Sequence, residues 1–461
     1  MTIDDIKNKT VGILGFGQEG QAVANYLTTK GLAPKIYDGK PLPNWTDINL
    51  AKLKDLKLEV VCDPNFIDIA AAECEILFRS PGIKVAMPIK PLITSQTQWF
   101  FEHCPSKIVG VTGTKGKGTT ASLLYEILQN QNGKRGKVFL TGNIGKTQPL
   151  EFMEDLTKDD LVIYELSSFQ LQDLKQSPQI GICLMVTSDH LDYHSDLNEY
   201  HSAKFAIAEY QNSSDTLIYN TDYEATKLVA KRGQGQKLSV SKFTDSHFKP
   251  TAQIIFEEDR EGIEINYTDK TFFVDTTKRL IKGQHNLENI AAASLAAIVL
   301  NVTLGDIQTA VNNFHGLKHR LQFVQEKAGV KYFNDSVSTN PDTTMAAIKS
   351  FEEPLILIVG GAEKNLDYSK LAKEITEAMN IKVVITMGPA GQIVQGLLKD
   401  NGCKKEVLGP YYDFTQVVGM AQKKAKSGEV VLLSPAATSF DMFNSYAERG
   451  DTFIKIVETL T

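Results

Sequence analysis

The sequence predicts a protein of the α/β class, in which helices cover mostly parallel sheets, and three observations lead to this prediction. Short apolar runs typical of strands alternate along the chain with longer stretches typical of helices. Glycine-rich turns directly follow two of these runs, as in strand–turn–helix units that bind phosphate groups. The length of 461 residues corresponds to roughly three domains of about 150 residues each.

Composition narrows the class of protein further. Hydrophobic residues make up 42% of the chain and charged residues 23%, which is typical of a globular protein and excludes a disordered one. With 49 Lys and Arg against 55 Asp and Glu, the net charge of −6 gives no basic field, so no nucleic-acid partner is expected. The five cysteines stand singly, as in a reducing compartment. No apolar run is long enough to span a membrane and no secretion signal is recognisable, so we expect a cytoplasmic protein without a membrane partner.

The first predicted domain covers residues 1–104 and begins as a Rossmann-like unit. An apolar strand at residues 10–14 leads into the turn GFGQEG, then into a helix, and then into a second strand that ends at Asp38. This order is typical of a unit that binds a dinucleotide, although close packing of a strand on a helix also requires such glycines. A second turn, Ser80-Pro81-Gly82, follows an apolar run at the edge of the sheet where ligands usually bind.

The second predicted domain covers residues 105–316 and opens with a P-loop on a mostly parallel sheet of the ATPase type. A strand at residues 107–112 runs into GTKGKGTT and a helix, where backbone N–H groups and the helix dipole hold phosphates and Lys117 adds a charge. Gly118 separates this lysine from the first hydroxyl, so Thr119 is the first candidate for an Mg²⁺ ligand and Thr120 the second. The predicted cofactor-binding residues are Gly113, Thr114, Lys115, Gly116, Lys117, Gly118, Thr119 and Thr120.

Two further strands of this domain end in groups that suit a metal ion. Glu165 follows the apolar run at residues 161–164 and is placed where a P-loop magnesium needs a carboxylate. The string DHLDYH at residues 189–194 follows another strand, and beside a P-loop its His190 is a candidate ligand rather than part of a solvated loop. Lys204, on the next helix-like stretch, is a surface lysine on the residues alone.

The end of the second domain carries two asparagines at the start of an Ala-rich helix. Asn286 and Asn289 are three residues apart and therefore lie on one face of this helix. Capping of the helix explains one of the two amides, and the other is available to a polar ligand.

The third predicted domain covers residues 317–461 and is again Rossmann-like. Apolar strands at residues 330–333, 354–359, 383–386 and 430–433 alternate with helical stretches, and glycine or small polar residues follow each strand. A mostly parallel sheet covered by helices is therefore expected here as well.

Eight strings, in chain order, resemble the motifs of the Mur ligase family over essentially the whole chain. They are GTKGKGTT, TGNIG, YELSSFQL, DHLDYH, GQHNLENIAAA, the pair His319-Arg320, NDSVSTN and SPAATSFDMF. The resemblance implies an ATP-dependent amide ligase of peptidoglycan synthesis that works through an acyl phosphate. Within the family the strings are most similar to the branch that adds D-glutamate to UDP-N-acetylmuramoyl-L-alanine, and a monomer is expected.

The resemblance also implies roles for individual residues around ATP and two Mg²⁺ ions. Lys117 would neutralise the β- and γ-phosphates and is assigned as catalytic together with His190 and Lys204. Thr119 and Glu165 would hold one Mg²⁺, and His190 would help to hold the second. Lys204 matches a lysine that is carbamylated in the family, so that it becomes a metal ligand. The residues matched to the adenine nucleotide are Asn286, Asn289, Arg320 and Asp335.

Substrate-binding residues are implied in the same way. In the first domain Gly17, Gln18, Asp38, Ser80 and Gly82 would hold the UDP moiety, which replaces the dinucleotide as the expected ligand of the glycine turn. The strings TGNIG and YELSSFQL supply Asn143 and Ser167, and the amino-acid site would consist of Lys364, Ser439 and Tyr446.

Three departures from the family pattern keep the incoming amino acid open. Val337 stands where the family usually has lysine, Met185 stands where asparagine is common, and GKGTT resembles the folylpolyglutamate synthetase branch. The alternatives are therefore a folylpolyglutamate-type ligase, for example one using L-glutamate, and the L-alanine-adding Mur ligase. A nicotinamide dehydrogenase would leave the P-loop unexplained, and a non-catalytic nucleotide-binding regulator would leave Glu165, His190 and Lys204 unexplained.

Overall fold

The computed structural model describes residues 1–85, 89–129, 136–145, 147–187, 193, 196–244, 248–257 and 260–460. Within this part of the chain lie three sheets, of five, nine and six strands. The chain divides into two compact units: unit 1 comprises Met1–Asp275 and Glu288–Gln308, and unit 2 comprises Thr276–Leu287 and Thr309–Thr461. Unit 1 contains the first two sheets and unit 2 contains the third.

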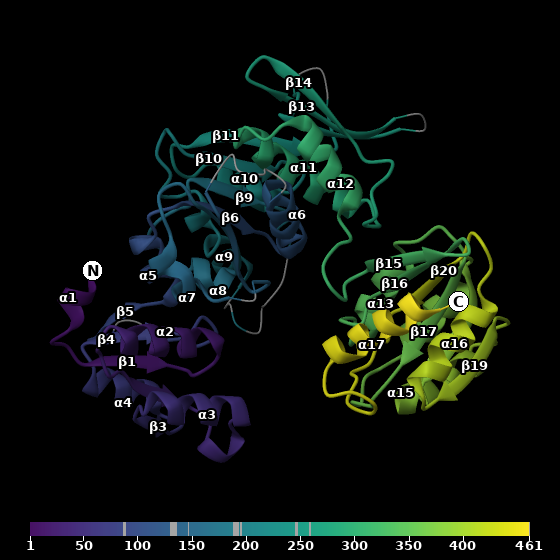
Figure 1. Ribbon diagram of the computed structural model, residues 1–461, viewed down its shortest axis with the longest axis horizontal. Helices are drawn as coiled ribbons and strands as arrows, with labels where there is room; N and C mark the ends of the chain where they lie inside the picture. Colours follow the sequence, from purple (N-terminus) through teal and green to yellow (C-terminus); the bar gives the residue numbers. More distant parts are fainter. Residues whose placement is uncertain are drawn as a thin grey trace. The chain divides into compact units, whose positions relative to one another are not determined.

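The first sheet has the strand order β3-β2-β1-β4-β5, and all of its pairings are parallel (Figure 1). This is the doubly wound arrangement expected of a Rossmann-like domain, and it places the ends of β1 and β4 side by side. The strands are β1 (Val11–Leu14), β2 (Lys35–Asp38), β3 (Val60–Cys62), β4 (Ile76–Arg79) and β5 (Leu92–Thr94). The helices are α1 (Ile3–Ile6), α2 (Gln18–Thr29), the 3-10 helix η1 (Leu42–Asn44), α3 (Asp47–Leu56), α4 (Phe66–Glu73) and α5 (Gln96–His103).

The second sheet has the order β14-β13-β12-β11-β10-β9-β6-β8-β7. It is parallel from β7 to β12, and β13 and β14 complete it as an antiparallel meander that the sequence pattern did not predict. Thr268 and Asp269 make the two-residue turn between β13 and β14, both at positive φ, as hairpin turns require. The strands are β6 (Lys107–Thr112), β7 (Val138–Gly142), β8 (Leu161–Glu165), β9 (Ile180–Cys183), β10 (Thr216–Asn220), β11 (Gln236–Ser241), β12 (Ala252–Phe256), β13 (Glu261–Tyr267) and β14 (Lys270–Asp275).

The helices that accompany the second sheet in the chain are mostly short. They are α6 (Lys117–Gln129), α7 (Pro149–Phe152), η2 (Met153–Asp155), α8 (Ser168–Leu171), α9 (Leu197–Ser202), η3 (Phe205–Ile207), α10 (Glu224–Ala230), α11 (His285–Val299) and α12 (Leu304–Asn313). The apolar run in α11 is a buried helix of 15 residues. No helix in the described part of the chain is both long enough and apolar enough to cross a membrane.

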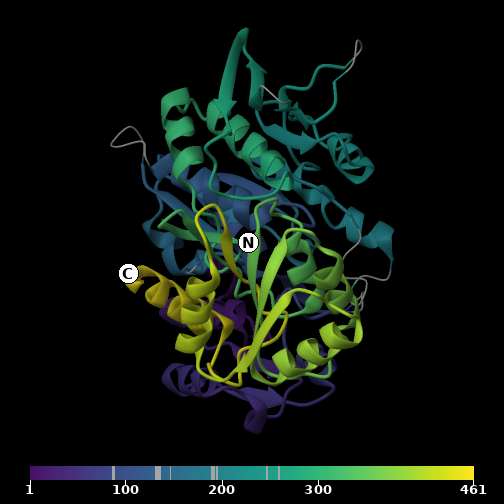
Figure 2. The same cartoon turned by 90° about the vertical axis from the view of Figure 1, so that its right-hand side faces the viewer.

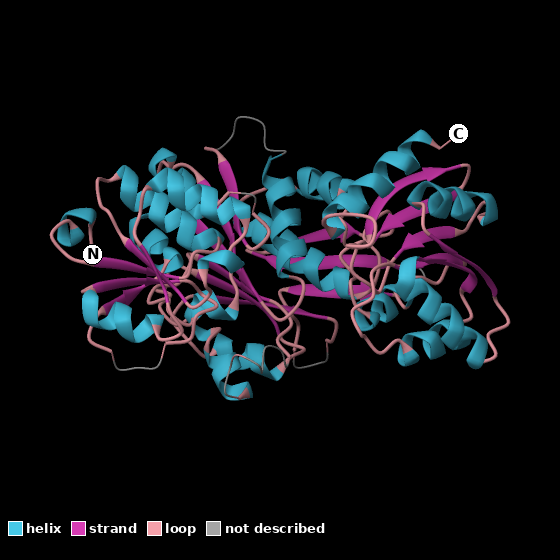
Figure 3. Cartoon of the chain, turned by 90° about the horizontal axis from the view of Figure 1, so that it is seen from below, coloured by secondary structure: helices cyan, strands magenta, loops and turns pink. Residues whose placement is uncertain are grey.

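The third sheet has the order β15-β16-β20-β17-β18-β19, with only β15 antiparallel to its neighbour. Every residue of β17 and β20 is buried because helices cover both faces, as Figures 2 and 3 show. The strands are β15 (Gln322–Lys327), β16 (Val330–Asn334), β17 (Leu355–Gly360), β18 (Ile381–Met387), β19 (Glu406–Tyr411) and β20 (Val430–Leu433). The helices are α13 (Pro341–Ile348), α14 (Ser369–Glu377), α15 (Gly388–Asp400), α16 (Phe414–Lys424) and α17 (Tyr446–Thr459).

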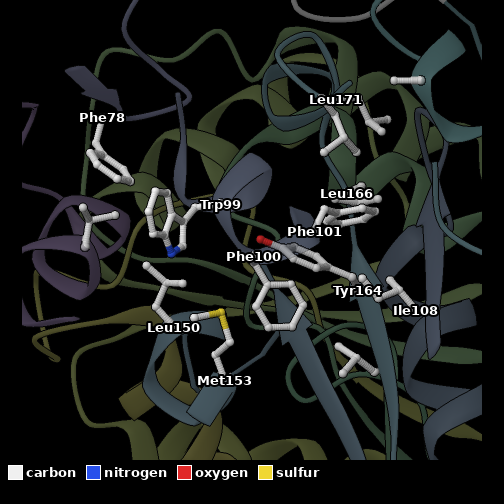
Figure 4. Close-up of a cluster of buried hydrophobic side chains, with 14 of the residues drawn as sticks. Phe78, Trp99, Phe100, Phe101, Ile108, Leu150, Met153, Tyr164, Leu166 and Leu171 are labelled. Atoms are coloured by element: carbon white, nitrogen blue, oxygen red, sulfur yellow. The ribbon is translucent and has the colours of Figure 1, made fainter. Parts of the chain in front are cut away.

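Helix α5 connects the cores of the first two sheets. Trp99 of α5 is fully buried, with its ring centre 5.5 Å from that of Phe78 in β4 (Figure 4). Phe100 packs edge-on against Tyr164 of β8, at 5.9 Å between ring centres. Burial of such large side chains stabilises the packing by about 2 kcal/mol each. The turns after β1 and β4 and those after β6 and β8 therefore belong to one packed unit.

Candidate active site

The P-loop lies between β6 and α6, as predicted, and its backbone is fixed by neighbouring segments. Gly113 and Gly116 have φ values of 152° and 87°, which side chains disfavour. The N–H of Thr114 donates to the carbonyl of Met185 at 2.7 Å, and its hydroxyl lies 2.9 Å from that of Tyr200. The loop is thus held against the segment that follows β9, and α6 begins at Lys117, four residues earlier than the apolar pattern indicated.

Lys117 folds back over the P-loop. Its Nζ donates to the carbonyl oxygens of Gly113 and Thr114, both at 3.1 Å. Thr120 is buried and donates to Oδ1 of Asn289 at 3.3 Å, so its hydroxyl serves the packing of α6. Thr119 is only partly buried, so it stays the first candidate for a metal ligand and Thr120 the second.

Glu165 lies at the same edge of the second sheet as the P-loop. The register pairs Glu165 with Val111 of β6 on one side and with Gly142 of β7 on the other. Its side chain is 5% exposed, and a Cβ added at Gly142 would stand 2.2 Å from its carbonyl oxygen. A carboxylate at the end of β8 and a hydroxyl at the start of α6 are the oxygen ligands that Mg²⁺ prefers, so the donors fit such an ion.

Of the two remaining predicted metal ligands, His190 and Lys204, the structure describes only Lys204. His190 lies outside the described residues. Lys204 is 1% exposed, so the interpretation as a surface lysine is wrong; its Nζ lies 4.3 Å from the ring centre of Tyr200, the residue that contacts Thr114. Burial, followed by the charge of Lys204, lowers the pKa of His201. Among the described residues no three His, Cys, Asp or Glu side chains cluster as a metal site.

The residues predicted to bind the adenine nucleotide lie in both units. Asn289 lies in unit 1 and contacts Thr120, whereas Asn286, Arg320 and Asp335 lie in unit 2. Both asparagines lie inside α11 and neither is its N-cap, so capping does not account for them; the Asn286 amide donates to the carbonyl of Lys282 at 2.6 Å.

Asp335 is buried at the end of β16 in unit 2. One carboxylate oxygen accepts from the N–H of Leu321 at 3.0 Å and the other from the hydroxyl of Ser434 at 2.8 Å. Burial raises the pKa of Asp335 to about 6, despite these bonds. Arg320 is exposed beside it, so of this pair only the arginine can meet a ligand without rearrangement.

The two turns of the first sheet lie together and leave an open edge. Asp38 accepts from the backbone N–H groups of Phe16 (3.2 Å) and Lys40 (2.9 Å), and Ser80 donates to the carbonyl of Gly15 at 3.3 Å. Both alternatives for the glycines have support, because a Cβ at Gly20 would stand 2.1 Å from the carbonyl oxygen of Gly15. A Cβ at Gly17 or Gly82 would meet nothing within 4 Å, and Gln18 is exposed, so these positions are open to a ligand.

Two further predicted substrate residues follow strands of the second sheet. Asn143 is exposed directly after β7. Ser167 is the N-cap of α8, where it forms a capping box with Gln170. Its hydroxyl therefore already has a structural partner.

The segments that carry Lys364 and the buried Ser439 meet within unit 2. Ala362, after β17, pairs with Thr438, which precedes Ser439, and this bridge brings the two segments together. The Nζ of Lys364 lies 5.1 Å from the ring centre of Phe440, an exposed residue that the sequence analysis did not single out. Tyr446 begins α17 and is half exposed, and its carbonyl accepts from Ser336 at 2.8 Å.

Val337, which stands where the family usually has lysine, directly follows Ser336 in the chain. It is partly buried, and its N–H donates to the carbonyl of His319 at 3.0 Å. The backbone of the string NDSVSTN is therefore held in place without the lysine.

Comparison with known proteins covers most of the chain. The family model described as Mur ligase middle domain matches residues 111–297, and the one described as Mur ligase, glutamate ligase domain matches residues 319–437. The chain is 32% identical over 466 residues to a UDP-N-acetylmuramoylalanine–D-glutamate ligase of Clostridium tetani, covering 99% of this chain and 98% of the relative. It is 34% identical over 469 residues to the protein of that name from Clostridium kluyveri, with the same coverage.

Solved structures agree with the fold. The MurF ligase of Thermotoga maritima in complex with ADP superposes with a TM-score of 0.55 at 18% identity, covering 99% of this chain and 97% of that one. The UDP-N-acetylmuramate–alanine ligase MurC of Thermotoga maritima gives 0.56 at 18% identity, covering 98% and 100%. These likenesses concern the three-sheet α/β architecture.

Proposed function

The chain belongs to the Mur ligase family, and on this premise we propose that it is the ATP-dependent ligase that joins D-glutamate to UDP-N-acetylmuramoyl-L-alanine in peptidoglycan synthesis. The observation that carries the proposal is the match to D-glutamate-adding relatives over 99% of the chain, which includes the first sheet with its two open turns. Membership of this family excludes the nicotinamide dehydrogenase considered above.

The reaction requires neutralisation of the negative charge on the transferring phosphoryl group more than it requires a protein nucleophile. The L-alanine carboxylate attacks the γ-phosphorus of ATP, which forms an acyl phosphate and releases ADP. The amine of D-glutamate then attacks the acyl carbon, loses a proton and expels phosphate. The P-loop suits the first step because Lys117 places a positive charge over the loop at the start of α6, and the N-terminus of a helix favours an anion.

Mg²⁺ would supply further charge neutralisation at this edge when bound. We propose that Thr119 and Glu165 hold one ion and that His190 and a carbamylated Lys204 help to hold a second. The burial of Lys204 supports this assignment, because desolvation disfavours the ammonium form and leaves the amine able to react with CO₂.

The other substrates are assigned to further residues of the two units. We propose that Gly17, Gln18, Asp38, Ser80 and Gly82 hold the UDP moiety, that Asn143 and Ser167 contact the same substrate, and that Lys364, Ser439 and Tyr446 hold the carboxylates of D-glutamate. The nucleotide is assigned to the P-loop with Asn286, Asn289, Arg320 and Asp335. We also retain the boundaries 1–104, 105–316 and 317–461 for the domains, a cytoplasmic location and a monomer as proposals.

An amino-acid panel tests the function. D-glutamate, L-glutamate, L-alanine, D-aspartate and L-lysine are each offered with ATP and UDP-N-acetylmuramoyl-L-alanine while phosphate release is followed. We expect release with D-glutamate alone. Release with L-glutamate instead would support the folylpolyglutamate-type alternative, which Val337 keeps open, and release with none of the five would refute the proposal.

A further inference from the structure

Arg79, the last residue of β4, is a buried arginine that the proposed mechanism does not use. It is 4% exposed, and it forms an ion pair with Asp173, to which its Nε donates at 2.8 Å. Its Nη2 also donates to the carbonyl of Phe169 in α8 at 3.3 Å. The last residue of a strand in the first sheet is thus bonded to the segment that follows Glu165 in the second.

The same guanidinium holds the turn after β4. Nη1 donates to the carbonyl oxygens of Pro81, at 3.1 Å, and Ile83, at 2.5 Å. These carbonyls flank Gly82, and Ser80 precedes them. Arg79 therefore binds the backbone of the turn that is proposed to hold UDP, and it does so from the buried side of the turn. Two hydrogen bonds from one rigid group restrict the conformation of a four-residue turn more than either bond alone.

Tyr193 connects a third segment to this arginine. Its hydroxyl accepts from Nη1 of Arg79 at 3.0 Å and donates to the carbonyl of Pro81 at 3.3 Å. Its ring packs edge-on against Phe169, at 4.5 Å between ring centres. Tyr193 belongs to the string that contains His190, so one guanidinium contacts three segments assigned to the site.

A second polar bridge runs parallel to the first. Oε1 of Glu19, in the first turn of α2, accepts from Nε2 of Gln170 at 2.8 Å, and Gln170 forms the capping box with Ser167. The glycine turn after β1 is therefore tied to α8 as the turn after β4 is. Both turns of the first sheet meet the same short helix of the second.

We propose that Arg79 is a positioning residue for the UDP-substrate, which fixes the Ser80–Ile83 turn against α8 and Tyr193. The inference rests on the proposed function of this turn. Because Arg79 is buried and its donors face protein oxygens, it acts through the turn and not by touching the substrate. Lysine cannot replace it, since an ammonium offers a point charge in place of a planar fork that reaches the carboxylate and the carbonyls together.

Two variants test this role: Arg79→Lys and Tyr193→Phe. We expect Arg79→Lys to raise the KM for UDP-N-acetylmuramoyl-L-alanine about tenfold or more and Tyr193→Phe about threefold, because each removes hydrogen bonds to a charged group. The KM for ATP should stay within about twofold, because the P-loop makes none of these contacts. Tyr193→Phe keeps the ring in place and removes one hydroxyl, so it serves if Arg79→Lys does not fold.

Lys35→Gln is the matched control. It removes an ion pair between β2 of the same sheet and Glu73 at the end of α4, at a partly exposed place away from both turns, and it should leave every KM unchanged. Calorimetric titration with UDP alone measures the affinity for UDP in the absence of catalysis. We expect Arg79→Lys to weaken this affinity by the same factor by which it raises the KM for UDP-N-acetylmuramoyl-L-alanine.

The outcomes separate this inference from the proposed function. A wild-type chain that binds UDP but performs no ligation would refute the function, while weaker UDP binding by Arg79→Lys would still support the positioning role. Unchanged KM and unchanged UDP affinity in both variants would overturn the inference. An equal loss of affinity for ATP together with a lowered Tm would also overturn it, because the arginine would then have a merely structural role.

Discussion

The side-chain oxygen of Asn289 lies directly on the backbone of Gly116, so that a Cβ added at Gly116 would stand 2.2 Å from it. Gly116 also has a φ of 87°, where a side chain is strained. The contact joins the start of α11 to the P-loop within unit 1, and it brings one residue proposed to bind the nucleotide to the loop proposed to hold its phosphates.

Gly116→Ala therefore tests the shape of the P-loop. The methyl group would have to displace Asn289 or change the loop, and both responses disturb the proposed nucleotide site. We expect the KM for ATP to rise about tenfold or more, with a loss of stability on the order of 1 kcal/mol from the positive φ. Gly419→Ala is the control, because its Cβ would meet nothing within 4 Å in α16; that change should be neutral or stabilising. An unchanged KM for ATP in Gly116→Ala would contradict the assignment.

Lys117→Ala should remove nearly all ligase activity and leave the protein folded. The change deletes a charge at the transferring phosphoryl group but little buried apolar surface, and loss of one such contact commonly lowers the rate by about 10² to 10³. Phosphate release and circular dichroism measure the two effects. Lys107→Ala, at the exposed opposite end of β6, should keep full activity. If Lys117→Ala retained most of its phosphate release, the P-loop assignment would be wrong.

The α/β class with mostly parallel sheets was predictable because a strand, a glycine turn and a helix are local in the sequence. Two helix boundaries differ from those that the apolar pattern indicated: α2 begins at Gln18 and α6 at Lys117, because the first turns of these helices carry polar residues and glycine. The β13–β14 meander was not predicted, because its polar and apolar residues also suit a loop. Family membership confirms the resemblance on which the residue roles were based.

Burial was the property that the sequence could not supply. Lysine is a residue type that usually lies on the surface. Lys204 is buried because η3, which it precedes, packs against the second sheet. The contacts of Arg79 could not be predicted either, because its partners range from Pro81, 2 residues away in the chain, to Tyr193, 114 residues away. Its position directly before Ser80-Pro81-Gly82 is the one signal that could have drawn attention to it.

The burial of Lys204 leads to a rescue experiment. Lys204→Ala should be inactive, and small carboxylates such as formate or acetate should restore part of the activity by taking the place of a carbamate. Rescue kinetics are the measurement, since the adduct is labile. Lys237→Ala is the control: burial lowers the pKa of Lys237, which donates to the carbonyl of Arg232, yet it lies outside the proposed site and its loss should need no rescue. Inactivity without rescue would leave Lys204 a packing residue and refute the carbamate.

Asp335 leads to a prediction about stability and pH. Its pKa is raised from 3.8 to about 6 in the folded protein, mainly by burial, so between these values the unfolded chain has released a proton that the folded chain still holds. The contribution of Asp335 to stability therefore falls as the pH rises from about 4 to 6 and stays low above that. Asp335→Asn should remove this part of the pH dependence. Unfolding free energies of both proteins at pH 4 and pH 6.5 give the comparison, and identical pH dependence would contradict the raised pKa.

The exposed ring of Phe440 beside Lys364 suggests how the amino acid is recognised. The face of the Phe440 ring attracts the ammonium group of Lys364, so this group stays directed toward the segment that carries Ser439. Lys364→Ala should raise the KM for glutamate by about ten- to a hundredfold, since the lost contact is a charge-assisted bond worth about 1.5 to 3 kcal/mol.

Phe440→Leu, which keeps the lysine and removes the aromatic face, should raise the same KM by only about threefold, in keeping with a cation–π contact of about 0.5 to 1 kcal/mol. The KM values for ATP and the UDP-substrate should stay within a few fold in both variants, because the groups proposed to bind those substrates are unchanged. If Lys364→Ala raised the KM for ATP as much as that for glutamate, Lys364 would belong to the nucleotide site and its assignment to the amino acid would be wrong.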